Sequence, residues 1–566
     1  MMPPVGVDLF EHLRTEGYYY VDKTPFIAEL VGGKALVNLF TRPRRFGKTL
    51  ALSTLKDFFE IGGDPALFDG LAIMENKAVC EQYQNRYPVI FLTLKGVEGQ
   101  TFEDAYDMLR VLLKWEANRL SFLLDSDKID AKEKLSLHRI LYERDTRTDI
   151  INSLNMLSAL LRKHYDKKVI ILIDEYDVPL DKAFHNNYYS RMVSLIRSLF
   201  GSALKTNDNL FFAVLTGALR VSKESIFTGV NNLAVRSITD RLFSEYFGFT
   251  DAEVRRMLED YDAPDKFDTA KEWYGGYHFG GGRLYCPWDI INYCADLRYD
   301  ANAKPKAYWI NSSGNDIIRR LAEMADESTR NAVEELIAGK TIERRVIQEL
   351  TYSEMYQTVD NVWSVLFLTG YLTKVGETAD GLLKLKLPNR EVRELFVTQI
   401  GDWFKAAVRR DTESVRAILE GVVKADAQEI ENNLNVIMQS MISYFDANES
   451  FYHGFLLGLL GQNSAWTSAS NRENGSGRSD ICVRNNGRRI GYIFELKYSK
   501  SFAGLDASSE IALRQAEDMR YADGLRTDGI RDVWLFGVAF HKKWCRVVVK
   551  RAGEPKPALP LIKKDV

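Results

Sequence analysis

A glycine, lysine and threonine near the start of the chain have the types and order that hold phosphate groups. After an apolar run, Gly47, Lys48 and Thr49 match the end of the pattern GxxxxGK[ST]. The glycine lets the backbone approach a phosphate, the lysine reaches the β- and γ-phosphates, and the threonine hydroxyl takes a Mg²⁺ ligand position, while the dipole of the following helix attracts the anion. The residues expected to contact a nucleotide are Arg45, Phe46, Gly47, Lys48 and Thr49.

One position departs from this pattern, because Arg42 stands where the first glycine is expected. The loop thereby loses a flexible corner, and Arg42, Arg44 and Arg45 could supply positive charge directly. Taken alone, the segment is also compatible with an ordinary basic turn.

A second segment supplies the acidic partners of such a loop. Residues 168–177 form an apolar strand that ends in Asp174 and Glu175, as a Walker B strand does. Asp174 would hold Mg²⁺ and Glu175 would polarise the attacking water. A buried strand ending in a solvated acidic turn is the alternative, but the two segments together favour nucleotide binding.

A further apolar strand, residues 210–215, is followed by Thr216 and Arg220. Strand ends at one edge of a parallel sheet converge on the ligand crevice. Thr216 could therefore sense the γ-phosphate and Arg220 could supply a cation, although each is also a common turn residue.

The C-terminal part carries a D…ExK pattern formed by Asp480, Glu495 and Lys497. Two carboxylates can bind Mg²⁺ or Mn²⁺, and a lysine can orient the water that attacks a phosphodiester. The alternative is a surface hairpin with an ordinary Glu/Lys pair. Glu449 and Gln515 could supply outer parts of such a site.

The turn between these residues predicts a strand register. Asn486-Gly487 is typical of a two-residue hairpin turn, which would pair Asn485 with Arg488 and Asp480 with Ile493. Asp480 would then share a face with Glu495 and Lys497 as a diagonal neighbour of Glu495. A slip of one residue would place it on the opposite face.

The elements that must position these residues follow from hydrophobic periodicity. Strands at 36–40, 89–94, 169–173 and 210–215 alternate with helical stretches such as 101–124 and 152–164, which predicts a doubly wound α/β domain over residues 1–250. Residues 251–440 are expected to be mainly helical, starting at an N-cap on Thr250 with Glu253. An amphipathic helix at 363–372, strands at 373–377 and 382–387 and a helix from Asn389 outline either a winged helix or a plain connector.

The last part, residues 441–566, is expected to form an α/β nuclease-like domain. It contains a helix at 450–460, a polar loop, the hairpin, a helix at 508–521 and a strand at 532–539.

Bulk composition narrows the class of protein. The 566 residues are 46% hydrophobic and 27% charged, which is typical of globular proteins. The net charge of the chain is −3. The segment from Asp446 onward, however, contains 19 Lys and Arg and 14 Asp and Glu, and this positive balance fits a polyanionic partner as well as an ordinary soluble surface. Five scattered cysteines, no signal segment and no long apolar run favour a cytoplasmic protein without a membrane span.

With these motifs in place, the chain resembles bacterial proteins that join an AAA-ATPase-like domain to a C-terminal PD-(D/E)XK nuclease-superfamily domain. The D…ExK block and residues 20–24, 42–49, 172–177, 215–217, 273–277, 308–309, 387–389 and 452–454 carry the resemblance. In this family Arg42 in place of glycine is usual. Asp22 and Lys23 could be a structural pair that docks the N-terminus beside the nucleotide.

The resulting hypothesis is an ATP-dependent, Mg²⁺- or Mn²⁺-dependent nuclease acting on DNA or RNA. The alternatives are a nucleotide switch whose nuclease fold only binds nucleic acid or protein, and a signalling or defence module. A protein partner or a homo-oligomer is compatible with each of them.

Overall fold

The computed structural model describes residues 2–142, 145–205, 207–220, 226–227, 233–309, 316–324, 327–398, 412–441, 449–461, 463, 465–474, 477–485 and 487–553. The chain forms two compact units, one of residues 1–324 and 339–395 and the other of residues 325–338 and 396–566. The division at 250/251 and 440/441 that the sequence suggests stays a prediction.

The first unit is built on a five-stranded sheet in the order β2-β3-β4-β1-β5, and every pairing in it is parallel. The strands are β1 (Val37–Thr41), β2 (Val89–Thr93), β3 (Val169–Asp174), β4 (Leu210–Gly217) and β5 (Leu233–Arg236). Every residue of β1 and β3 is buried. The near-continuous apolar strands therefore mark a sheet covered on both faces, as the sequence predicted.

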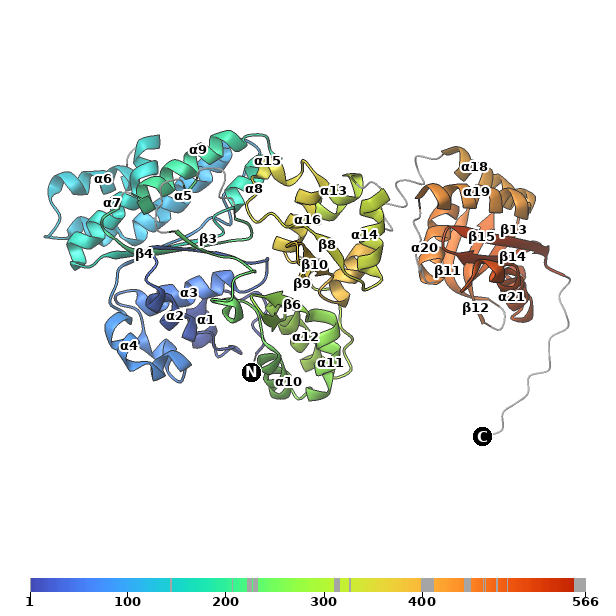
Figure 1. Ribbon diagram of the computed structural model, residues 1–566, viewed down its shortest axis with the longest axis horizontal. Helices are drawn as coiled ribbons and strands as arrows, with labels where there is room; N and C mark the ends of the chain where they lie inside the picture. The colour runs from blue at the N-terminus through green and yellow to red at the C-terminus, as the bar shows by residue number, and fades with distance from the viewer. Residues whose placement is uncertain are drawn as a thin grey trace. The chain divides into compact units, whose positions relative to one another are not determined.

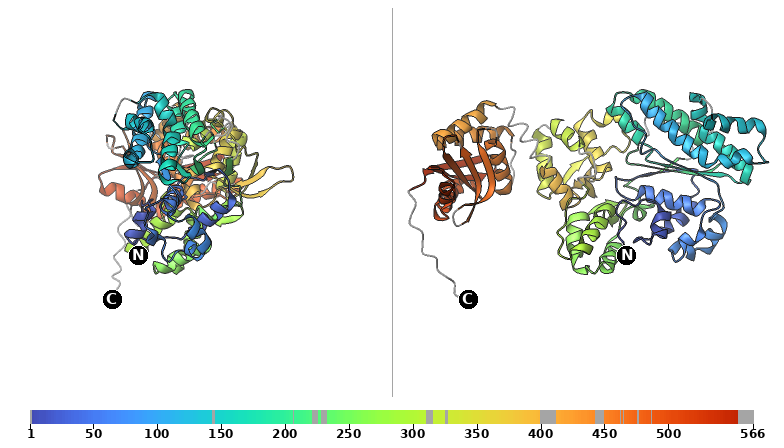
Figure 2. Two further views of the ribbon diagram at one scale, coloured as in Figure 1. Left: turned by 90° about the vertical axis from the view of Figure 1, so that its left-hand side faces the viewer. Right: turned by 180° about the vertical axis from the view of Figure 1, so that it is seen from behind.

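Helices cover the two faces of this sheet (Figure 1). On one side lie α1 (Phe10–Thr15), α2 (Pro25–Gly33), α3 (Lys48–Phe59) and α4 (Lys77–Tyr83). On the other lie α5 (Phe102–Arg119), α6 (Ala131–Tyr142), α7 (Arg147–Tyr165), α8 (Val178–His185) and α9 (Tyr189–Phe200). The reverse view in Figure 2 shows the same layers. The helix expected over 101–124 ends earlier, because a 3₁₀ turn over Ser121–Asp125 follows α5.

A helical region follows the sheet within the same unit. It contains α10 (Asp251–Asp260), α11 (Phe267–Tyr274) and α12 (Pro287–Tyr299), with the short strands β6 (Tyr277–Phe279) and β7 (Gly282–Leu284). Thr250 caps α10, and the Glu253 side chain bonds back to the Thr250 backbone, so the predicted capping box is confirmed. Further along the chain, α13 (Asp316–Met324) and α15 (Tyr352–Met355) belong to this unit, whereas α14 (Glu327–Ile337) belongs to the second unit.

The helix expected over 363–372 is α16, which spans Val359–Leu368. It is not amphipathic, because all residues from Val362 to Leu368 are buried. The strands β9 (Thr373–Glu377) and β10 (Leu383–Lys386) follow, and β8 (Ile342–Arg344) joins them in the order β8-β10-β9. Residues 390–398 are helical. These elements are compatible with a winged helix, which stays a hypothesis.

The second unit contains a mixed five-stranded sheet in the order β11-β12-β13-β14-β15. Its strands are β11 (Thr467–Asn474), β12 (Gly477–Asn485), β13 (Ile490–Tyr498), β14 (Asp532–His541) and β15 (Trp544–Arg551), and only the β13–β14 pairing is parallel. The prediction of a polar loop after α20 (Glu449–Leu460) is wrong in part, because β11 occupies part of that segment. As an edge strand, β11 is held by backbone hydrogen bonds to β12 and needs no apolar run.

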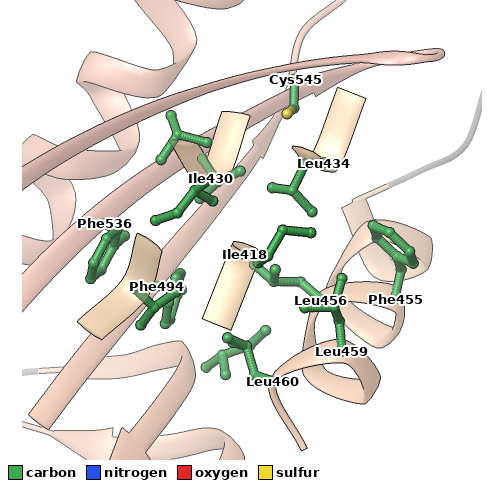
Figure 3. Packing of buried hydrophobic residues seen from close by; sticks show 14 of the residues in the cluster. Ile418, Ile430, Leu434, Phe455, Leu456, Leu459, Leu460, Phe494, Phe536 and Cys545 are labelled. Atoms are coloured by element: carbon green, nitrogen blue, oxygen red, sulfur yellow. The ribbon is translucent and has the colours of Figure 1, made fainter. Parts of the chain in front are cut away.

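Two cores flank this sheet. The helices α18 (Thr412–Lys424), α19 (Ala427–Met441) and α20 (Glu449–Leu460) pack on one face, where Ile418, Leu434, Leu456, Phe494 and Phe536 meet (Figure 3). On the other face lie α21 (Leu505–Asp518) and α22 (Tyr521–Thr527). The single helix expected over 508–521 is therefore two helices, and Arg520, with φ +56°, separates them.

The register predicted for the hairpin is wrong by two residues. Asn485 pairs with Ile490 instead of Arg488, and Cys482 instead of Asp480 lies opposite Ile493. The turn is longer because Arg488 N donates to the Asn485 side chain at 3.2 Å and Arg489 takes φ +54°. Since strand faces alternate with period 2, a shift of two residues leaves every side chain on its predicted face.

Candidate functional site

The loop between β1 and α3 has the conformation of a phosphate cradle. Gly47 takes φ +78°, which favours glycine, and Lys48 begins α3 directly after it. The Lys48 side chain is 3% exposed; its Nζ donates to the carbonyls of Arg42 and Pro43 at 3.3 and 3.1 Å and lies 3.3 Å from Glu175. The first backbone N–H groups of α3 and the Lys48 ammonium group therefore lie close together, as binding of a phosphate requires.

Asp174 connects this loop to the neighbouring strands. Its Oδ2 accepts a hydrogen bond from the Thr49 hydroxyl at 2.8 Å, and its Oδ1 accepts one from the Thr216 hydroxyl at 2.6 Å. The three residues converge because β1, β4 and β3 are adjacent and parallel, so their carboxyl ends meet at one edge. Burial, with repulsion from Glu175, raises the pKa of Asp174. A divalent cation at this carboxylate would offset that cost.

Two residues at this edge of the sheet have positive φ angles, which residues other than glycine rarely adopt. Arg45 has φ +71° and Glu175 has φ +52°. Such conformations cost of order 1–3 kcal/mol each and cluster at functional sites. The strain therefore favours a functional role for this edge of the sheet.

A cavity of about 540 Å³ opens beside the loop. Its lining includes the predicted residues Arg45, Phe46, Gly47, Lys48, Thr49 and Glu175. Tyr19, Phe249, Met257 and Trp288 give it an apolar part, and the Arg45 guanidinium stacks 4.1 Å from the centre of the Trp288 ring. Sequence patterns did not point to Trp288 or Tyr19, since both come from segments distant from the loop.

Arg42 does not supply charge to the cavity, contrary to one expectation. Its side chain is fully buried, and its Nη1 donates to the carbonyls of Thr41 and Arg236 at 2.8 and 2.7 Å. Burial lowers its pKa to about 9. Arg42 thus ties the ends of β1 and β5 together in place of the missing glycine.

The structure does not pair Asp22 with Lys23. Asp22 accepts hydrogen bonds from the backbone of Thr24 and of Ala72 at 2.8 and 2.7 Å, whereas Lys23 bonds to Glu253 at 2.7 Å. Each fastens the N-terminal segment to a different element, and Lys23 also lines the cavity.

Arg220 is not brought to the cavity among the described residues. Its Nη2 lies 2.8 Å from Glu349 Oε1. The guanidinium that was expected to contact a nucleotide therefore forms an ion pair with Glu349 instead.

The second unit brings the D…ExK residues together. Leu496 N donates to Asp480 Oδ2 at 2.8 Å, and Asp480 N donates to Glu495 Oε2 at 3.4 Å. Lys497 Nζ lies 3.9 Å from Glu495 Oε1. Glu495 is 1% exposed, so this carboxylate is held in a nearly dry environment.

Residues from flanking helices support these carboxylates. Gln515 on α21 donates from Nε2 to Glu495 Oε1, and the His453 ring on α20 contacts the Asp480 carbonyl at 2.8 Å. Burial, with the charges of Glu495 and Asp480, raises the pKa of the neighbouring Tyr521. Gln515 was a candidate from the sequence, whereas Tyr521 carried no signal. The side chain of Glu449 lies outside the described residues.

The donor set fits Mg²⁺ at both places. Hard oxygen donors are present in each, a hydroxyl and a carboxylate at Thr49 and Asp174 and two carboxylates at Asp480 and Glu495. No group of three or more His, Cys, Asp or Glu side chains suited to a metal occurs within the described ranges. Mg²⁺ commonly binds one or two carboxylates and completes its shell with water and substrate phosphates.

Two further properties concern the described residues. Cys80, Cys286, Cys294 and Cys545 are free thiols. Within the part of the chain that the structure describes, every helix is too short or too polar to cross a membrane.

Two parts of the chain match models of known protein families. Residues 4–227 match the model of a family described as predicted AAA-ATPase, and residues 447–550 match that of the PD-(D/E)XK nuclease superfamily. A relative from Azotobacter chroococcum mcd 1, named "Uncharacterized protein in vnfD 5'region", is 25% identical over 562 residues, which cover 95% of this chain and 96% of the relative. The chain therefore combines an N-terminal AAA-ATPase-like domain with a C-terminal domain of the PD-(D/E)XK nuclease superfamily.

Proposed function

We propose that the protein binds and hydrolyses ATP with Mg²⁺ in its first unit and cleaves phosphodiester bonds of nucleic acid with Mg²⁺ or Mn²⁺ in its second. The observation that carries the proposal is that each unit gathers hard oxygen donors beside a lysine, Asp174 with Lys48 in one and Glu495 with Lys497 in the other.

In the nucleotide site, Lys48 and the N–H groups at the start of α3 would hold the phosphates. Thr49 and Asp174 would hold Mg²⁺, which neutralises charge on the phosphates. Glu175, next to Lys48 at the cavity, would accept a proton from the attacking water, and Thr216 would keep Asp174 in position through their 2.6 Å hydrogen bond.

In the nuclease site, Asp480 and Glu495 would hold the metal, which stabilises charge on the phosphate. Lys497 would orient the attacking water, because its side chain lies on the same face as Glu495 and is 27% exposed. Gln515 would fix the rotamer of Glu495 through the hydrogen bond from Nε2.

A full-length protein assay tests both halves. Supercoiled plasmid, single-stranded DNA and RNA are incubated with Mg²⁺ or Mn²⁺, with and without ATP, and both phosphate release and cleavage are measured. Glu175→Gln is expected to retain ATP binding and lose phosphate release, while Asp480→Asn is expected to lose cleavage and retain phosphate release. Independent loss of the two activities would assign each reaction to its own unit.

A binding-only role for the second unit is the alternative. It is favoured because Asp480 and Glu495 are only two metal ligands, and no third acidic, histidine or cysteine side chain joins them among the described residues. In that case the protein is a nucleotide-dependent switch whose nuclease fold binds nucleic acid or protein. Retained nucleic-acid binding without cleavage, with either metal and on every substrate, would support this alternative.

A further inference from the structure

Two aromatic side chains lie exposed together at one edge of the second unit. Phe502, just after β13, is 57% exposed, and Trp544, at the start of β15, is 41% exposed. Their rings meet edge to face with centroids 5.6 Å apart. Within the described part of this unit, they are the exposed aromatic side chains. We call this pair the aromatic edge.

The aromatic edge lies on the same face of the sheet as the D…ExK residues. Side chains alternate along β15, where Cys545 and Val547 pack into the core under α19 and Val548 packs toward α21. Trp544 therefore points to the α21 side. Glu495, which bonds to Gln515 of α21, points the same way.

The strand register gives the separation. Lys497 pairs with Ala539 of β14, which pairs with Arg546 of β15, and Trp544 lies two residues beyond Arg546. With about 4.8 Å between strands and about 3.3 Å per residue, the Cα atoms of Lys497 and Trp544 are roughly 12 Å apart. A bound strand of a few nucleotides can span this distance.

The charge around the aromatic edge is mainly positive. Residues 497–506 and 541–546 contain five lysines and arginines and one acidic residue, Asp506. Lys542 and Lys543 form the turn that joins β14 to β15, and Lys500 is exposed beside Phe502. Arg546 is already engaged, since it pairs with Asp506 and Glu431.

These features favour nucleic acid over protein and single strands over duplexes. Aromatic rings among lysines are typical of surfaces that track a phosphate backbone while bases stack on the rings. In a duplex the base faces are already covered by neighbouring pairs, so exposed rings gain contacts only with unpaired bases.

We propose that the aromatic edge binds single-stranded nucleic acid, with bases stacked on Phe502 and Trp544 and phosphates held by Lys500, Lys542 and Lys543. The bound strand leads to Asp480, Glu495 and Lys497, which makes single-stranded regions the substrate class. Only this last step rests on the proposed nuclease activity; the binding itself does not.

The test measures binding and cleavage separately on the full-length protein. Fluorescence anisotropy with labelled oligothymidylate, oligouridylate and a blunt duplex is recorded with EDTA present, so that no cleavage occurs. Phe502→Ala and Trp544→Ala are each expected to weaken binding of a single strand roughly 5- to 100-fold while changing duplex binding little. Trp544→Phe is expected to restore most of the affinity because a ring remains.

Trp115→Ala is the matched control, since this residue is 68% exposed on α5 of the first unit. Unchanged single-strand affinity in both alanine variants would overturn the proposal, as would equal losses for single strands and duplex. Intact binding without cleavage would instead count against the proposed nuclease reaction and leave the aromatic edge supported. The two oligonucleotides distinguish DNA from RNA.

Discussion

Replacement of Lys48 by alanine gives the sharpest test of the nucleotide site. In the free protein, Lys48 Nζ bonds to two loop carbonyls and lies 3.3 Å from Glu175. On binding ATP it would exchange these partners for phosphate oxygens. Lys48→Ala is therefore expected to weaken ATP binding and to leave the sheet intact, because β1 and the start of α3 remain held by backbone hydrogen bonds.

The magnitude follows from the contacts that change. A hydrogen bond to a charged group contributes about 1.5–3 kcal/mol, and about 1.4 kcal/mol corresponds to a tenfold change in affinity. Since Lys48 gives up carbonyl bonds when it turns to the phosphates, the net loss for two new contacts is about 1.5–3 kcal/mol rather than twice that. The expected loss of affinity is about 10- to 100-fold.

Isothermal titration calorimetry with Mg-ATP measures this effect on the full-length protein. Lys56→Ala is the matched control, because Lys56 lies on the same helix and pairs with Glu60 at 3.0 Å, away from the loop. Thermal unfolding of each variant checks that the first unit is folded. Equal ATP affinity in wild type and Lys48→Ala would refute the assignment of the loop.

Three further predictions concern the remaining charged and polar groups. Lys497→Ala should lower the cleavage rate at least about tenfold while metal binding, followed by calorimetry with Mn²⁺, stays nearly unchanged, since Lys497 acts on water and charge rather than on the ion; lost metal binding would contradict its role. Gln515→Ala should free the carboxylate of Glu495 and weaken Mn²⁺ binding several-fold, whereas unchanged binding and cleavage would show that α21 does not position Glu495. Burial, with repulsion from a neighbouring carboxylate, raises the pKa of Asp177 from 3.8 to about 7, so the folded state holds this proton more tightly and stability falls as pH rises from about 4 to about 7. Asp177→Asn should flatten this part of the melting temperature profile, and identical profiles would disprove the linkage.

The sequence alone indicated which motif residues come together at each candidate site. Lys48 and Thr49 follow an apolar strand, and Asp174 ends another, so parallel pairing of the two brings their ends to one edge. Glu495 and Lys497 share a face because they are two residues apart in a strand. These relations depend on local periodicity, which is visible in a single chain.

The register of the hairpin shows how far local rules extend. The Asn-Gly turn predicted the correct face for Asp480 but the wrong partner, because the loop is longer by two residues. The predicted face was still correct because the error in register was two residues, and side chains alternate with a period of two. An odd error would have removed Asp480 from the site.

Tertiary structure alone decided which neighbours complete the sites. Arg42 is close to the nucleotide loop in sequence, yet its guanidinium is fully buried against carbonyls of β1 and of Arg236. Trp288 is 241 residues after Gly47, yet both line one cavity. The exposed pair Phe502 and Trp544 arises in the same way, from strands brought into register. Such contacts depend on how distant segments pack, and packing is a property of the whole fold rather than of any sequence window.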